Sequence, residues 1–211
     1  MILLIGMFDS PYVRRVAVSL RLLGFAFEHR NWSVGQDFEQ IRRYNPLGRV
    51  PTLVLDDGEV LTEAAAILDW ADEAVGSERA LLPPRGAPRR RALQLMGLAT
   101  SAADKGVAQL YERAFRPEEK RHEPWLVRCR TQVEAGLAEL ERLCAARESH
   151  WLLGPQLTQA DITVAAVSTF LIEALPLDAA RWPALNALRL QAEALSAFRE
   201  FHQPFFAPQT G

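Results

Sequence analysis

The feature that most constrains the fold of this chain is a single change of pattern near Pro88. Before it, short apolar runs of strand length alternate with runs in which apolar residues recur at helical spacing. After it, every periodic run has helical spacing. A segment rich in Gly and Pro, the breakers typical of a linker, separates the two parts. We therefore predict an α/β domain over residues 1–78, a linker over 79–88 and an all-helical domain over 89–211.

The first domain is predicted to follow the order β-α-β-α-β-β-α. Its strands are expected over residues 2–5, 25–31, 52–55 and 60–61, and its helices over 11–23, 37–44 and 63–75. In the second domain, helices are expected over residues 89–114, 118–147, 158–175, 181–195 and 196–202. The pattern therefore indicates a small sheet domain followed by a helical one.

Charge and hydropathy argue against several classes of partner. The formal net charge is -2, so the chain has no strong field to attract nucleic acid or an anionic membrane. Its apolar runs are shorter than the roughly 20 residues that a membrane-spanning helix needs. Cys129 and Cys144 lie on one predicted helix about 22 Å apart at about 1.5 Å per residue, too far for a disulfide. We expect a cytoplasmic protein, and the scattered Cys and His residues predict no metal site.

The first candidate site is the run Phe8-Asp9-Ser10-Pro11-Tyr12, at the predicted junction of the first strand and first helix. Ser10 before Pro11 is typical of a helix start, where the serine oxygen accepts a hydrogen bond from the first turn. Alternatively, the hydroxyl points outward at the helix N-terminus, where N–H groups and the helix dipole favour an anion such as a thiolate. Both roles are compatible, because a hydroxyl accepts and donates.

The second candidate site is the turn Asn45-Pro46-Leu47-Gly48-Arg49-Val50-Pro51, directly before a strand-like run. Pro51 either opens an edge strand or follows a cis peptide bond. In the cis form, the N–H and C=O of Val50 turn outward and can pair with a peptide-like ligand. The sequence leaves the isomer open.

The third candidate site is Glu63-Ala64, at the start of a predicted helix. An acidic residue in a first turn often does no more than complement the helix dipole. Alternatively, Glu63 and the neighbouring amides hold the ammonium and carboxylate groups of an amino-acid ligand.

In this order and spacing, the three runs resemble the glutathione transferase superfamily, in particular its bacterial serine-type members. The resemblance rests on Ser10-Pro11-Tyr12-Val13-Arg14, on Asn45-Pro46 with Val50-Pro51, and on Glu63-Ala64-x-Ala66-Ile67. Residues 152–162 resemble the family's C-terminal folding motif, in which Thr158 caps a helix and Asp161 completes a capping box. The resemblance implies a thioredoxin-like N-terminal domain and an all-helical C-terminal domain.

The resemblance also implies roles for individual residues. Glutathione, as co-substrate, would lie along the edge of the first domain with its sulfur facing Ser10, which donates a hydrogen bond to it. The glutathione-binding residues implied are Ser10, Gln36, Arg49, Val50, Pro51, Glu63 and Ala64. The residues implied for the electrophile pocket are Phe8, Tyr12, Lys105, Gln109 and Tyr111. Arg49 is explained equally well as a solvated turn residue, and residues such as Lys105 are more often surface or packing positions.

The function implied is conjugation of glutathione to small hydrophobic electrophiles by a homodimer active in detoxification. Ala64 departs from the family pattern, in which a serine hydroxyl helps to bind the γ-glutamyl carboxylate. The alternatives are a glutathione-dependent isomerase, dehalogenase or peroxidase, or a non-catalytic interaction protein of the same fold, which Ala64 favours. The chain has no Ser-Ser-Cys run and no cysteine at position 10, which argues against the maleylacetoacetate isomerase and omega-like classes.

Overall fold

The strands of the N-terminal half form one mixed sheet in the order β2-β1-β3-β4, as seen in the computed structural model, which describes residues 1–207. The strands are β1 (Ile2–Ile5), β2 (Phe27–Arg30), β3 (Thr52–Val54) and β4 (Val60–Thr62). β1 runs parallel to β2 and antiparallel to β3, and β3 is antiparallel to β4. This thioredoxin-like arrangement confirms the predicted order of elements.

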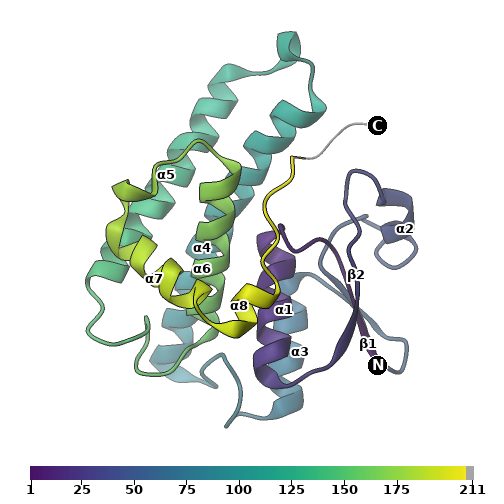
Figure 1. The fold of residues 1–211 in the computed structure, drawn as a ribbon, viewed down its shortest axis with the longest axis vertical. Coiled ribbons are helices and arrows are strands. Elements are labelled where there is room, and N and C mark those ends of the chain that lie inside the picture. Colours follow the sequence, from purple (N-terminus) through teal and green to yellow (C-terminus); the bar gives the residue numbers. More distant parts are fainter. Residues whose placement is uncertain (208–211) are drawn as a thin grey trace.

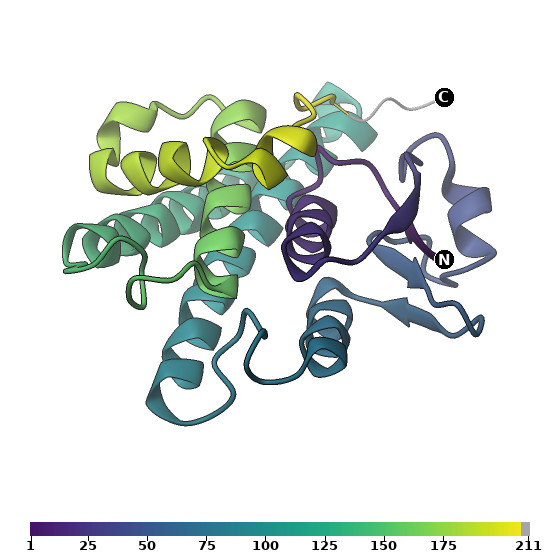
Figure 2. The same ribbon diagram turned by 60° about the horizontal axis from the view of Figure 1, so that its bottom comes forward.

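Three helices accompany the sheet. They are α1 (Pro11–Leu23), α2 (Phe38–Arg42) and α3 (Ala64–Val75). Figure 2 shows α1 and α3 between the sheet and the helical half of the molecule, with α2 on the other side of the sheet. The inward face of α1 carries Val13, Val16 and Leu20, all fully buried, at the spacing of one helical face. Gly24 ends the helix in the left-handed conformation, with φ 87°.

The C-terminal half is built from helices, as predicted. They are α4 (Gly86–Phe115), α5 (Glu123–Ala145), α6 (Gln159–Ala174), α7 (Pro183–Glu193) and α8 (Ser196–Glu200), with 3₁₀ turns at Glu118–Lys120 and Ala179–Arg181 (Figure 1). α4 begins three residues earlier than expected, so residues 86–88 of the expected linker are helical. The helices expected from residues 118 and 181 begin later, because Pro124 and Pro183 occupy the first turns of α5 and α7.

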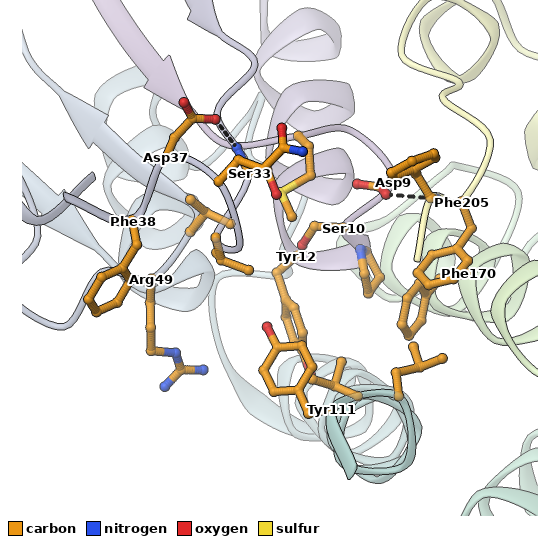
Figure 3. A pocket seen from close by; sticks show the side chains of 18 of the residues that line it. Asp9, Ser10, Tyr12, Ser33, Asp37, Phe38, Arg49, Tyr111, Phe170 and Phe205 are labelled. Atoms are coloured by element: carbon orange, nitrogen blue, oxygen red, sulfur yellow. Dashed lines mark hydrogen bonds between the residues drawn. The ribbon is translucent and has the colours of Figure 1, made fainter. Parts of the chain in front are cut away.

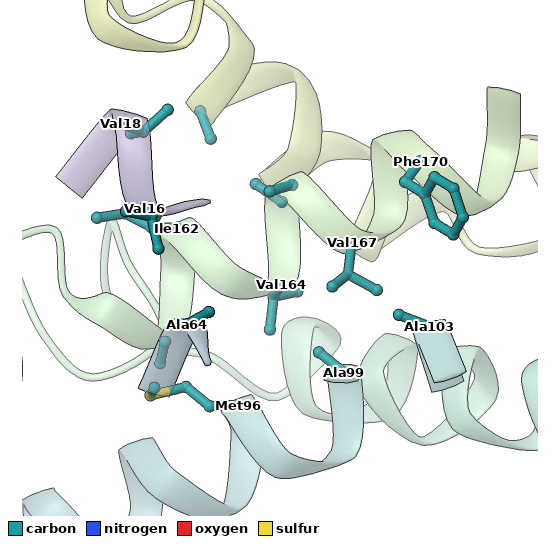
Figure 4. Packing of buried hydrophobic residues seen from close by; sticks show 14 of the residues in the cluster. Val16, Val18, Ala64, Met96, Ala99, Ala103, Ile162, Val164, Val167 and Phe170 are labelled. Carbon is teal, nitrogen blue, oxygen red and sulfur yellow. The ribbon is translucent and has the colours of Figure 1, made fainter. Parts of the chain in front are cut away.

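Helix α6 is the centre of the core. Residues 159–171 of this helix are all buried, which fits its lack of a polar face. Figure 4 shows Ile162, Val164 and Val167 of α6 between side chains of α1 and α4. At its N-terminus, the Asp161 carboxylate accepts hydrogen bonds from the Thr158 N–H at 2.9 Å and the Thr158 hydroxyl at 2.7 Å. These contacts confirm the predicted capping box.

The two halves are also joined by a buried ion pair beside α1. The Arg14 guanidinium donates to both Glu193 carboxylate oxygens of α7, at 2.7 and 2.6 Å, and to the Phe198 carbonyl at 2.9 Å. Arg14 is 3% exposed, so removing its partner would leave a buried charge uncompensated. This contact fixes the N-terminal end of α1 against the last helices of the chain.

Candidate functional site

Ser10 lies where β1 gives way to α1, with Pro11 in the first helical turn. Its backbone carbonyl accepts from the Arg14 N–H at 2.9 Å, so the residue occupies the N-cap position as predicted. Its side chain, however, makes no capping hydrogen bond, which corrects the expectation that the oxygen accepts from the helix. The hydroxyl is therefore available to another partner, at the end of the helix where the dipole favours negative charge.

A cavity of about 620 Å³ opens beside Ser10, within the range of roughly 300–1,000 Å³ typical of small-molecule sites. Figure 3 shows Ser10 in its wall, close to Asp9 and Tyr12. Both halves of the chain contribute to this wall. The N-terminal half contributes residues 7 and 9–12 and side chains from the segments 31–38 and 47–50. The helical half contributes residues 104, 107, 110, 111, 115, 170, 203, 205 and 206. The cavity thus lies at a boundary between two units of the fold, where ligand sites are common.

One side of the cavity is polar. It includes Ser33, Gln36, Asp37 and Arg49. The Asp37 carboxylate accepts from the Ser33 N–H at 2.8 Å and so shapes the loop before α2 (Figure 3). Of the residues predicted to bind glutathione, Ser10, Gln36, Arg49 and Val50 are brought together around this cavity.

The peptide bond between Val50 and Pro51 is cis, which resolves the isomer that the sequence left open. Within residues 1–207, the backbone N–H and C=O of Val50 form no hydrogen bond with the protein. Behind this turn, Gly6 has φ 132°, and a Cβ on it would lie 2.7 Å from the Val50 Cβ. A glycine is therefore required where β1 passes behind the turn.

Glu63 and Ala64 lie beside the cavity rather than in its wall. Glu63 has φ 69°, an uncommon value for a residue other than glycine. Its carboxylate is 3.3 Å from the Arg49 guanidinium, and both side chains are exposed, so this ion pair contributes little to stability. Ala64 is buried at the start of α3. The third candidate site is thus connected to the cavity through Arg49.

Tyr12 lines the cavity, but its hydroxyl is already engaged. The phenol donates a short hydrogen bond to the Asp104 carboxylate of α4. Burial and this hydrogen bond both raise the pKa of the Tyr12 phenol, so it stays protonated at neutral pH. Tyr12 therefore joins the two halves at the cavity, whereas the Ser10 hydroxyl forms no hydrogen bond with residues 1–207 of the protein.

The other side of the cavity is apolar and aromatic. It includes Leu110, Tyr111, Phe115, Phe170, Phe205 and Phe206. Tyr111, predicted from the sequence for an electrophile pocket, lies in this wall and packs edge-to-face against Phe115 at 5.0 Å between ring centroids. An aromatic wall opposite a polar one is suited to a ligand with one polar and one apolar part.

Three other residues predicted for the electrophile pocket lie outside this cavity. The Phe8 ring stacks on His29 at 3.9 Å and packs into the core. Lys105 of α4 points to α5, with its ammonium 5.5 Å from the centroid of the Trp125 ring. Gln109 is buried, and its amide is directed back to the Lys105 carbonyl. The rotation of α4 turns the face of Val107, Leu110 and Tyr111 to the cavity instead.

The C-terminal segment, Gln203–Phe206, also belongs to the site, and no sequence pattern predicted this. The Gln203 side chain accepts from the Phe8 N–H at 3.0 Å, and the Asp9 carboxylate accepts from the Phe206 N–H at 3.1 Å. Burial raises the pKa of Asp9, the hydrogen bond from Phe206 opposes this rise, and repulsion by Glu173 adds to it. Figure 1 shows this end of the chain running past α1.

Over residues 1–207, no helix is long and apolar enough to cross a membrane. The same part of the chain contains no group of three or more His, Cys, Asp or Glu side chains that could hold a metal ion.

Comparison with known proteins identifies relatives of both halves. Residues 4–79 match the model of the glutathione S-transferase N-terminal domain, and residues 108–200 match that of the C-terminal domain. A glutathione S-transferase from Methylobacterium radiotolerans, solved with glutathione sulfonate, is 32% identical; the match covers 100% of this chain and 95% of that one, with a TM-score of 0.88. The uncharacterized GST-like protein YibF of Escherichia coli K12 is 30% identical over 65% of this chain and 67% of its own. A maleylacetoacetate isomerase from Pseudomonas aeruginosa is 27% identical over 93% and 92% of the two chains.

Proposed function

The chain belongs to the glutathione S-transferase family, and from this premise we propose that it is a serine-type glutathione transferase that conjugates reduced glutathione to small hydrophobic electrophiles. The observation that carries the proposal is the Ser10 hydroxyl, which lies at the N-terminus of α1, makes no capping bond and faces a cavity with one polar and one aromatic side.

The chemical task is to keep the glutathione sulfur ionised. A free thiol has a pKa near 8.5, so only a few per cent is thiolate at neutral pH, and the thiolate is the nucleophile. A hydrogen bond donated by Ser10 and the positive end of the α1 dipole both stabilise the thiolate over the thiol. A hydrogen bond to a charged group contributes about 1.5–3 kcal/mol, which lowers the thiol pKa by about one to two units.

Binding of the tripeptide is assigned to the polar side of the cavity. In this proposal, the free N–H and C=O of Val50, beside Pro51, pair with the cysteinyl backbone, and Gln36 or Arg49 binds the glycyl carboxylate. The γ-glutamyl end lies near Glu63 and the Ala64 N–H. Because Ala64 has no hydroxyl, one hydrogen bond to a charged carboxylate is missing, at a cost of about 1.5–3 kcal/mol of binding free energy.

The reaction itself is a nucleophilic attack by sulfur. The thiol proton passes to solvent, and the thiolate electron pair forms a bond to an electrophilic carbon. Either a leaving group departs with its electron pair, or the electrons of a conjugated double bond move to a carbonyl oxygen and water then protonates the enolate. The aromatic side of the cavity is the part suited to bind the hydrophobic electrophile.

We further propose a cytoplasmic homodimer with a role in detoxification. The cytosol supplies reduced glutathione and keeps thiols reduced, which fits the two buried free cysteines. In this dimer, the N-terminal domain of one subunit, assigned to residues 1–78, faces the helical domain of the other, residues 89–211, joined within each subunit by residues 79–88. Sedimentation at micromolar concentration tests the dimer, and a monomer there contradicts it.

The experiment that tests the proposed activity combines binding and turnover. Wild type and Ser10→Ala are compared for retention on immobilised glutathione and for conjugation of a reactive aryl halide. We expect both proteins to be retained and only the wild type to accelerate conjugation strongly. Ser33→Ala serves as a control, because it removes another hydroxyl at the same cavity. Retained activity in Ser10→Ala would remove Ser10 from its assigned role.

One alternative function is favoured by a specific residue. Ala64 weakens the expected glutathione site, and a chain that does not bind glutathione would be a non-catalytic interaction protein on the same fold. Failure of the wild type to bind immobilised glutathione is the result that supports this alternative. The similarity to an isomerase keeps glutathione-dependent isomerisation as a second use of the same thiolate, which product analysis with an unsaturated diketo acid distinguishes.

A further inference from the structure

The C-terminal segment Gln203–Phe206 is anchored to the cavity at three points. The Gln203 side chain bonds the Phe8 N–H, Glu173 of α6 accepts from the Phe205 N–H at 3.3 Å, and Asp9 accepts from the Phe206 N–H. The Phe205 ring also packs edge-to-face on Phe170 at 5.8 Å between centroids. The backbone at Phe206 is therefore held in place relative to Ser10, the neighbour of Asp9.

The ring of Phe206, in contrast, is left uncovered. Phe206 is 61% exposed, although its backbone N–H is bonded to the Asp9 carboxylate, one oxygen of which is buried. Exposing a phenyl ring to water is unfavourable by about 25 cal/mol per Å² of apolar surface. A ring that is exposed while its backbone is fixed at a cavity wall is available to pack against a ligand.

Exposed aromatic residues are concentrated around this one cavity. Of the large aromatic side chains that are exposed in residues 1–207, the cavity is lined by Phe38, Tyr111, Phe115 and Phe206, whereas Tyr44 and Trp125 lie elsewhere. Tyr111, Phe115 and Phe206 form the aromatic side of the cavity together with Phe170 and Phe205, opposite the polar side. Aromatic rings pack favourably against another aromatic ring, in offset-stacked or edge-to-face geometry.

We propose that Phe206 is the specificity-determining residue that makes this protein prefer electrophiles with a planar aromatic ring next to the reacting carbon over those without one. In this proposal, Asp9 is a positioning residue that acts through the Phe206 backbone. The inference rests on the proposed conjugation function and deepens it, because it names the residue that sets the preference of the aromatic side among electrophiles.

Holding Phe206 in advance is what makes it selective. A loose C-terminal segment would lose conformational freedom on binding, which weakens every contact that it makes. The Asp9 carboxylate and the Gln203 amide remove that freedom before the ligand arrives. Because Asp9 directly precedes Ser10, the same loop sets the distance between the aromatic ring of Phe206 and the sulfur of bound glutathione.

The test compares two enones that differ only in the group to be recognised. Benzylideneacetone carries a phenyl ring, and its analogue carries a pentyl chain in the same position. In both, the thiolate forms a carbon–sulfur bond at the β-carbon, the double-bond electrons move to the carbonyl oxygen, and water protonates the enolate. Conjugation of each enone is measured for wild type and Phe206→Leu, which keeps an apolar side chain but removes the ring.

We expect Phe206→Leu to raise the KM for the phenyl enone by about three- to tenfold, the range of a lost aromatic pair, and to leave the KM for the pentyl enone nearly unchanged. Phe206→Tyr keeps the ring and is expected to retain the wild-type preference. Leu190→Ala is the control, because Leu190 is an exposed apolar residue on α7 away from the cavity. Equal effects of Phe206→Leu on both enones would overturn the inference.

The positioning role of Asp9 is tested by rescue. Asp9→Ala removes the acceptor for the Phe206 N–H and is expected to lose the preference for the phenyl enone, with the KM for glutathione unchanged. Asp9→Asn keeps an acceptor oxygen and is expected to restore the preference. If neither substitution alters the preference, Asp9 has no such role. A wild type that conjugates neither enone contradicts the proposed function itself, whereas a wild type that conjugates both equally contradicts only this inference.

Discussion

Replacing Ser10 by Ala separates the two roles that its position at a helix start allows. A serine at an N-cap usually contributes about 1 kcal/mol to stability through its side-chain hydrogen bond to the helix. In this protein the hydroxyl makes no such bond. The free energy of unfolding of Ser10→Ala should therefore differ from that of wild type by less than about 0.5 kcal/mol. A larger loss would show that the hydroxyl caps α1 in solution.

The effect on the bound thiol should be much larger. Losing a hydrogen bond to the thiolate costs about 1.5–3 kcal/mol, and each pKa unit corresponds to about 1.36 kcal/mol. Since the hydrogen bond favours the ionised form, its removal raises the pKa of bound glutathione by about one to two units. At pH values below the pKa of glutathione bound to wild type, the conjugation rate of Ser10→Ala should be about 10- to 100-fold lower than that of wild type. Above pH 9 or so, where both complexes are ionised, the two rates should converge.

The assay is a pH titration of the ultraviolet absorbance of the thiolate in the glutathione complex, paired with chemical unfolding of the same samples. Ser10→Thr keeps a hydroxyl and is the matched control, expected to stay close to wild type in both measurements. An unchanged thiolate titration in Ser10→Ala, with full glutathione binding, would refute the reasoning. The sulfur would then be stabilised by another group.

Three further substitutions test other parts of the structure. Gly6→Ala should weaken glutathione binding by about tenfold in calorimetry, because its Cβ would collide with Val50, whereas Gly58→Ala, also at positive φ but with nothing within 4 Å, should leave affinity intact. Asp9→Asn should be more stable than wild type at neutral pH: burial raises the folded-state pKa of Asp9, so its ionisation destabilises the fold above that pKa. This difference should shrink as the pH falls to about 4, as followed by urea unfolding. Asp161→Ala should lower the free energy of unfolding by about 3 kcal/mol without changing glutathione affinity, and a small loss in urea unfolding would contradict the role of the capping box.

Local signals in the sequence predicted most elements to within a few residues. The apolar spacing in α1, Gly24 at its end and the pair Thr158 and Asp161 at the start of α6 all act over a few positions in the chain. Such interactions depend on near neighbours, so they can be recognised without knowing the fold. Pro124 and Pro183 are also local signals, since proline is favoured in a first helical turn, and they mark the starts of α5 and α7 more closely than the predicted ranges do.

Part of the candidate site could be predicted in the same way. Ser10 and Gln36 lie in the loops that precede α1 and α2, and Arg49 and Val50 lie in the loop between α2 and β3. The fold brings all four to one cavity. Which residues of α4 line the cavity depends on how this helix is rotated about its axis. The family resemblance implies Lys105 and Gln109 on α4, but a helix presents only one face to a cavity. Because α4 packs against α5 and α6, the face with Val107, Leu110 and Tyr111 is the one that lines this cavity.

The sequence by itself therefore determined the order of the elements, the helix caps and the identity of the residue at the start of α1, because each of these depends on residues a few positions apart. Only the tertiary structure decided that Phe206 lies beside Asp9, from which it is separated by 197 positions. Their contact depends on how α7 and α8 pack against α1 through Arg14 and Phe198. No local sequence pattern predicts such a contact, because distant residues meet only when all the helices of the close-packed core fit together.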